Sequence, residues 1–234
     1  MDGITEAFGE AARLITNADP GLYAIVALSL KVSLTAVLAA AVIGLPLGAV
    51  IAITRFPGRQ TLIVALNALM GLPPVVVGLG VYLLLSRAGP LGPMGLLFTP
   101  QAMMIAQTIL IMPIVAALSR QVLEDAWHEY EEQLRSLGAQ SHEAALTLLW
   151  DTRFSLVTIV LAGFGRAAAE VGAVMIVGGN IDGVTRVMTT AIALETSKGD
   201  LPLALGLGVI LVSLVVAINA AAQLIKTAAQ RRYG

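Results

Sequence analysis

Apolar residues in this chain gather into runs that are long enough to cross the hydrocarbon core of a bilayer as helices. The short segments of alternating hydrophobicity that build membrane barrels are missing from the sequence. The pattern predicts an all-α, polytopic membrane helix bundle of about five transmembrane helices, in a single domain over residues 1–234. The predicted spans cover residues 22–54, 62–85, 102–118, 154–177 and 201–225.

Prolines and glycines interrupt the second apolar run. Pro73 and Pro74 lack backbone N–H donors, so the helix is predicted to break or bend there. Because broken helices are tolerated in membranes where the backbone lines a cavity, we interpret the two prolines as part of a pore or gate. Packing is the alternative. For Gly78 and Gly80 we favour packing, since small residues let helices approach closely. The same role is expected of Gly44 and Gly48 in the first run.

The composition narrows the possible functions. Apolar residues make up 57% of the 234 positions and charged residues 12%, an apolar content that polar surface could hardly cover in water. The chain has no cysteine and two histidines, so we expect no metal site, no cofactor and no redox chemistry. We find no Gly-rich phosphate loop, nucleophile elbow or paired acids, so we expect no catalytic residues and no ATP hydrolysis by this chain. The scattered basic residues form no nucleic-acid patch.

Lysine and arginine are unequally divided between the two sides of the predicted bundle. By the positive-inside rule the richer side is cytoplasmic, which places the N-terminus outside and the C-terminus inside. An odd number of spans agrees with this orientation. The richer side carries Arg55, Arg59, Arg120, Arg135, Arg153, Lys226, Arg231 and Arg232, and the poorer side carries Arg13, Lys31, Arg87, Arg186 and Lys198.

A polar stretch separates the third and fourth predicted spans, over residues 120–153. Glu132 leads into Gly138, and a glycine permits a sharp turn of the backbone. A second helix is expected to start in the residues that follow, Ala139, Gln140 and Ser141, with an exposed end that can fit a cleft on a partner. An ordinary solvated loop with a helix-stopping glycine is the alternative.

This polar stretch resembles the cytoplasmic EAA loop of binding-protein-dependent ABC importer permeases, which docks on the ATPase subunit. Glu132 and Gly138 keep the spacing of that motif. The match is partial, because Gln133 and Leu134 stand where the motif has alanines and residues 150–151 replace its Leu-Pro.

A second stretch makes the resemblance more specific. Residues 163–181 are similar to the segment after the EAA loop in the molybdate, tungstate and sulfate permeases. Glu170-Val-Gly172 with Gly179-Asn180 is the most specific part, and the run Gly-Gly-Asn-Ile-Asp-Gly looks closest to tungstate permeases. The resemblance covers roughly residues 25–225. It implies the MetI-like fold of ABC importer permeases, with residues 120–153 as the coupling loop.

The resemblance also implies a function and partners. The chain would be the permease that moves an oxyanion, tungstate before molybdate and then sulfate, across the cytoplasmic membrane of a prokaryote. ATP hydrolysis in a separate ATP-binding cassette subunit would drive transport. An extracytoplasmic substrate-binding protein would deliver the anion, and a second copy of the chain would complete the path within the membrane lipid. A self-sufficient anion channel or secondary transporter is the alternative, although five spans without an inverted repeat disfavour it.

Three polar residues in or after the fourth predicted span are candidates for the translocation path. Arg166 and Glu170 are four residues apart, which places them on one face of a helix. We favour a structural ion pair, because ionised residues at this depth are expensive and usually pair. A position of Arg166 on the anion path is the alternative. Asn180 is expected on the outer side, at a binding-protein surface or outer gate or in a plain surface loop, together with Thr185, Arg186 and Thr189.

Overall fold

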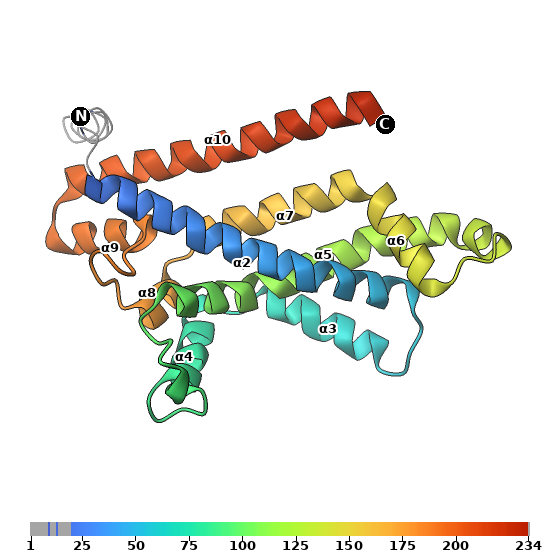
Figure 1. The fold of residues 1–234 in the computed structure, drawn as a ribbon, viewed down its shortest axis with the longest axis horizontal. Helices are drawn as coiled ribbons and strands as arrows, with labels where there is room; N and C mark the ends of the chain where they lie inside the picture. The colour runs from blue at the N-terminus through green and yellow to red at the C-terminus, as the bar shows by residue number, and fades with distance from the viewer. Residues whose placement is uncertain (1–8, 10–12, 14–19, 234) are drawn as a thin grey trace.

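The computed structural model describes residues 9, 13 and 20–233, and every regular element among them is a helix (Figure 1). Three of these helices, α2, α5 and α10, are long and apolar enough to cross a membrane; counting the bent pairs α3–α4 and α6–α7 as one span each raises the number to five. The predicted all-α membrane bundle is therefore confirmed. The elements are α2 (Pro20–Ile53), α3 (Arg59–Met70), α4 (Pro74–Leu85), the 3₁₀ helix η1 (Gly92–Met94), α5 (Pro100–Ser136), α6 (Ser141–Asp151), α7 (Arg153–Ala168), α8 (Gly172–Gly178), α9 (Met188–Lys198) and α10 (Leu201–Tyr233).

The centre of the bundle is the contact between α2 and α5, which lie along each other in Figure 1. Small residues make this close approach possible. A Cβ atom on Gly48 would lie 2.9 Å from the carbonyl oxygen of Ala116, and one on Gly44 would lie 3.0 Å from Cγ1 of Val115. Contacts this short leave no room for a side chain. The packing role predicted for Gly44 and Gly48 is confirmed.

Helix α5 is much longer than the predicted third span. The apolar run ends near Leu118, but the helix continues for more than four turns to Ser136. The continuation is rich in strong helix formers, and Arg120 and Glu124 form an ion pair one turn apart. Arg59 at the start of α3 also binds Glu124, with 2.6 Å between Nη2 and Oε1. The end of the hydrophobic run is thus not the end of the helix.

The break predicted at the two prolines is confirmed, and it is sharp. Helices α3 and α4 are bent by 102° relative to each other, and α4 starts at Pro74. A proline at the first helical position is compatible with the helix because that N–H has no intrahelical partner. A Cβ on Gly78 would lie 2.7 Å from Cα of Ala173 in α8, whereas one on Gly80 meets nothing within 4 Å. Packing within this chain therefore explains Gly78 but not Gly80.

The fourth predicted span is wrong as a continuous helix. Helix α7 ends at Ala168, and a separate short helix, α8, begins at Gly172. The residues after it are not a plain loop either, because 188–198 form α9, which packs against α10. Figure 1 places α4, α8, α9 and the start of α2 towards one end of the bundle, and α6 at the other.

Candidate functional site

The break between α7 and α8 is built around a buried carboxylate. Glu170 is only 3% exposed. Its Oε2 accepts a hydrogen bond from Nη1 of Arg166 at 2.7 Å, and its Oε1 accepts one from the backbone N–H of Ala173 at 3.0 Å. Its own carbonyl oxygen accepts a bond from the hydroxyl of Thr189 at 2.8 Å. The side chain of Glu170 therefore joins the end of α7 to the start of α8, and its backbone carbonyl attaches this break to α9.

The predicted pairing of Arg166 with Glu170 is confirmed, but the two residues do not share a helix. Arg166 lies in the last turn of α7, and Glu170 lies beyond its end. The two partners differ in their surroundings, since the Arg166 side chain is 35% exposed while Glu170 is buried. Within this chain the guanidinium of Arg166 is therefore partly accessible, whereas the carboxylate of Glu170 is not.

A second polar side chain supports the same break. The amide of Gln107 in α5 donates a hydrogen bond from Nε2 to the carbonyl oxygen of Ala167, 3.1 Å away, near the end of α7. Gln107 is buried, and its Oε1 has no hydrogen-bond partner among the residues that the structure describes. In an apolar interior a carbonyl at a helix end needs such a partner.

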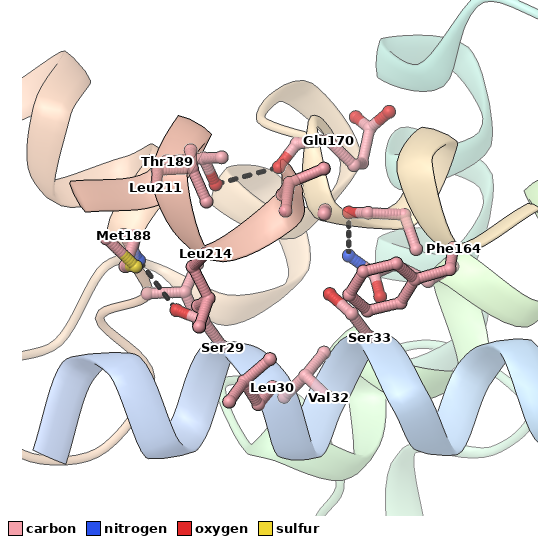
Figure 2. Close-up of a pocket in the computed structure, with 15 residues that line it drawn as sticks. Ser29, Leu30, Val32, Ser33, Phe164, Glu170, Met188, Thr189, Leu211 and Leu214 are labelled. Atoms are coloured by element: carbon pink, nitrogen blue, oxygen red, sulfur yellow. Dashed lines mark hydrogen bonds between the residues drawn. The ribbon is translucent and has the colours of Figure 1, made fainter. Parts of the chain in front are cut away.

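These polar groups line a small cavity of about 20 Å³, enclosed by α2, α5, α7, α9 and α10. A volume of this size fits one water molecule. Figure 2 shows two of the hydrogen bonds across its walls, from the backbone N–H of Met188 to the Ser29 hydroxyl and from Thr189 to the carbonyl of Glu170. The hydroxyl-bearing residue Ser33 lies on the same wall as Ser29, one helical turn away.

The proline break lies next to this polar cluster. A Cβ on Gly172 would lie 2.9 Å from Cγ2 of Val75 and 3.7 Å from Oε1 of Glu170. The first turn of α4, which begins at Pro74 after Pro73, is therefore adjacent to the break between α7 and α8. Two helix interruptions far apart in the sequence meet at one place in the bundle.

Asn180 lies at the opposite end of α8 from Glu170. It has a left-handed backbone with φ of 50°, which asparagine tolerates better than most residues. Its Nδ2 is 3.4 Å from the carbonyl oxygen of Thr190, and its buried Oδ1 has no partner among the described residues. Thr185 and Thr189 are buried, so the plain surface loop is wrong for these two threonines. Arg186 forms an ion pair with the exposed Asp182.

The polar stretch between α5 and α7 forms a helix, a sharp corner and a second helix. Gly138 occupies the corner with φ of 74°, a conformation that disfavours residues with a side chain. The second helix, α6, begins at Ser141, directly after Ala139 and Gln140, as expected. Glu143 closes its first turn by accepting a bond from the N–H of Gln140 at 2.8 Å. The turn and the helix start are confirmed; Glu132 lies exposed in the last turns of α5.

One face of this corner is apolar although it lies in the polar end of the molecule. Leu148 is buried against α2 and α5 and holds α6 in place, and Ala144 on the same helix is also buried. In contrast, Leu137 is 75% exposed and Leu146 is 65% exposed. Exposed apolar side chains beside a rigid turn are typical of a surface that another protein covers.

Other parts of the site have weaker signals in the amino-acid sequence. Gln107 is a lone amide in an apolar run, and Ser29 and Ser33 are four residues apart in another. Such isolated polar residues in spans usually face the bundle interior, and this rule could have identified them. No group of three or more histidine, cysteine or acidic residues among the described residues is arranged to hold a metal ion.

An all-helical bundle with several membrane-spanning helices, a polar break inside it and a helical corner with exposed apolar residues defines a multi-pass membrane protein of the transport class. No family model matches the chain. It is 43% identical over 220 residues to the tungstate uptake system permease protein TupB of Peptoclostridium acidaminophilum, covering 94% of this chain and 96% of that one. It is 41% identical over 204 residues to a probable anion ABC transporter permease protein of Haloferax volcanii, covering 85% and 88%.

A TupB protein of Campylobacter jejuni is 35% identical over 219 residues, covering 94% of this chain and 92% of that one. The chain belongs to the TupB family of ABC transporter permeases. The sulfate transport system permease protein CysW of Synechocystis is a more distant relative, 32% identical over 75% of this chain. The resemblance stated from the sequence motifs is confirmed.

Proposed function

We propose that this chain is the permease of an ABC importer that moves an oxyanion into a prokaryotic cell, tungstate before molybdate and then sulfate. Tungstate is placed before sulfate because two relatives are named as tungstate uptake permeases and a more distant one as a sulfate permease. The position of molybdate rests on the resemblance of the sequence motifs alone. The chain itself has no catalytic role. ATP hydrolysis in a separate ATP-binding cassette subunit drives the transport.

The observation that carries the proposal is the meeting of the two helix breaks beside Arg166. In transporters, interrupted helices near the middle of the membrane present helix N-termini to anionic substrates. Here the first turn of α4, after Pro73 and Pro74, packs against Gly172, next to the carboxylate of Glu170. Glu170 is the structural member of the pair, and the more accessible Arg166 faces the path and offsets the anion's charge in passing.

The coupling surface is the corner between α5 and α6 within residues 120–153. Gly138, Ala139, Gln140 and Ser141 form the turn and helix start that enter a cleft of the ATPase, and Glu132 in the last turns of α5 leads into them. The exposed side chains of Leu137 and Leu146 supply apolar contact area at the same corner. This assignment rests on the family motif and on the shape of the corner.

The remaining partners follow from the arrangement of the chain. The basic residues near α6 and at the end of α10 favour a cytoplasmic position for that end, with the N-terminus outside and the C-terminus inside the cytoplasmic membrane. Asn180 then lies on the outer side, where the substrate-binding protein delivers the anion. Residues 1–234 act as one permease domain, and a second copy completes the pathway.

The proposal is tested by purifying the tagged chain from its native membranes in mild detergent and identifying the proteins that accompany it. We expect an ATPase subunit with the natural chain and its loss with Gly138→Asp, because a side chain strains the corner and blocks the cleft. Gly199→Asp is the matched control, since Gly199 ends α9 with φ of 84° at a site with open space around it.

Reconstitution separates the two transport hypotheses. With the ATPase and binding protein present, the natural chain should take up tungstate into liposomes only when ATP is supplied. A chain that purifies alone and moves the anion without ATP would overturn the importer proposal in favour of a channel or secondary transporter.

A further inference from the structure

Helices α2, α3 and α5 meet at the side chain of Arg59, the first residue of α3. Its Nε donates a hydrogen bond to the carbonyl oxygen of Ile51 in the last turn of α2 at 2.7 Å, and its Nη2 lies 2.6 Å from Oε1 of Glu124 in α5. Glu124 also pairs with Arg120, one turn earlier in α5. The side chains of Arg59, Arg120 and Glu124 are 23%, 15% and 22% exposed, so one carboxylate joins two guanidinium groups in a largely enclosed cluster.

The position of Arg59 is unfavourable for α3 alone. A cation in the first turn of a helix opposes the helix dipole, whereas a cation at the end of a helix is favourable and can bind the last carbonyls. Arg59 makes the second kind of contact with α2, through Ile51, and an ion pair with α5. Its contacts therefore stabilise the junction of the three helices and not the helix that carries it.

An apolar interface continues the attachment along α3. Ile63 and Leu66 of α3 are buried in one cluster with residues of α2 and α5, and Met70, the last residue of α3, packs against that cluster. From Arg59 to Met70 the contact extends for about 17 Å, at a helical rise of about 1.5 Å per residue. Helices α3 and α5 are thus joined along the whole length of α3.

This joined pair connects two distant places in the molecule. In one direction α5 continues from Glu124 to Ser136 for about 18 Å and ends at the corner that contains Gly138. In the other direction α3 ends at Met70, just before the break at which α4 begins at Pro74, bent by 102°. Figure 1 shows α3 extending between α4 and the end of the bundle that carries α6.

We propose that Arg59 and Glu124 are positioning residues for transport, which make α3 follow α5 so that movement of the coupling corner moves the proline break. The inference rests on the proposed function, in which the corner binds the ATPase and the break lies on the anion path. Apolar contacts are non-directional and allow helices to slide, whereas a charge-assisted hydrogen bond of defined geometry fixes their relative position. Ion-pair networks and rigid helices carry coupling between distant sites in this way.

The first test measures the attachment of α3 to α5 without any transport. The chain has no cysteine, so spin labels can be placed at Gln60→Cys and Gln121→Cys, two exposed positions beside the cluster. With Arg59 present we expect one narrow distribution of distances between the labels, and with Arg59→Gln a broader one. Arg59→Lys keeps a cation for Glu124 and should stay narrow.

The matched control is Lys198→Gln, which removes the cation of an ion pair with Glu195 within α9 and should leave the distribution narrow. Equal distributions in the natural chain and Arg59→Gln would overturn the attachment, whatever the protein transports.

The second test uses the complete importer in liposomes, with the ATPase and the binding protein, and measures tungstate uptake per ATP hydrolysed. Arg59→Gln should keep the ATPase bound, because the corner is unchanged. It should lower the uptake ratio about fivefold or more, the lower end of a typical coupling between two sites. Arg59→Lys should restore most of the ratio, and Lys198→Gln should not change it.

The ratio distinguishes a positioning role from a purely structural one. A structural role would lower the unfolding midpoint of Arg59→Gln but leave the uptake per ATP of the assembled importer unchanged, and this result would overturn the proposal. If the natural chain showed no ATP-dependent uptake, the proposed function would fail and the coupling role with it. The distance measurement would then still show whether Arg59 attaches α3 to α5.

Discussion

Two helix interruptions in this permease satisfy the backbone groups at their helix ends in opposite ways. At the break between α7 and α8, polar groups are enclosed in an apolar interior, and the side chains of Gln107 and Thr189 satisfy backbone carbonyls from distant segments. At the corner between α5 and α6, Gly138 and the neighbouring Gln140 and Glu143 make the turn locally. The interior break depends on tertiary structure, whereas the corner depends on its own sequence.

This difference implies that the interior break contributes to the stability of the fold and the corner to recognition by a partner. Inside the membrane a lost hydrogen bond cannot be replaced by solvent, so each polar residue at the break is tied to the fold. At the corner water can satisfy the backbone, which leaves Leu137 and Leu146 exposed without a role in the monomer's core. Substitutions at the break should therefore reduce stability, and substitutions at the corner should reduce association.

The largest loss of stability is expected from Glu170→Ala. The substitution leaves Arg166 without its partner and removes the acceptor for the N–H of Ala173. Removing one member of a buried ion pair costs about 3–5 kcal/mol, and because Arg166 is partly exposed the expected cost is at the lower end, about 3 kcal/mol. Thermal unfolding in detergent measures it. The control Asp182→Ala removes a surface pair with Arg186 and should change stability by less than about 1 kcal/mol.

If Glu170→Ala lowered the free energy of unfolding as little as Asp182→Ala does, the structural role of Glu170 would be contradicted. The exchange of charges, Arg166→Glu with Glu170→Arg, sharpens the interpretation. Arginine has no acceptor for the N–H of Ala173, so the double variant should recover only part of the stability.

An intermediate loss is expected from Gln107→Leu. The substitution keeps the side chain's approximate size but leaves the carbonyl of Ala167 without the amide donor from α5. The carbonyl still accepts the N–H of Glu170 at 3.1 Å, so the expected cost is that of one lost hydrogen bond, about 0.5–1.5 kcal/mol. The same unfolding assay measures it, with Gln101→Leu as control because Gln101 is exposed at the start of α5. An unchanged unfolding midpoint in Gln107→Leu would mean that the interior break does not depend on this distant residue.

The two regions also differ in how far their structure could be predicted. The turn at Gly138 and the helix start after it follow from local residue types, and the all-helical membrane fold follows from the apolar runs. The end of α7 at Ala168 could not be predicted in this way. No proline marks it, and Gln107, which binds the last turn of α7, is 60 residues away in the sequence.

Other parts of the site also divide into contacts that local sequence predicts and contacts that depend on tertiary structure. The spacing of Arg166 and Glu170 predicted their contact, because a separation of four residues brings side chains together even where the helix is ending. The meeting of the α4 start with Glu170 required the tertiary structure, since it depends on the packing of Gly172 against Val75. The coupling and gate roles of these residues remain predictions.

The smallest effect on stability, and the clearest effect on association, is expected from Leu146→Ser. Leu146 is exposed on the outer face of α6, so its replacement should change the unfolding free energy by less than about 0.5 kcal/mol. If this face enters the ATPase cleft, loss of a central apolar contact should weaken binding about tenfold or more, measured by titrating purified ATPase subunit onto the reconstituted permease. Leu201→Ser is the matched control and should bind normally, because Leu201 is another exposed leucine, at the start of α10. Equal binding by both variants would remove Leu146 from the docking surface while leaving the corner at Gly138 to be tested on its own.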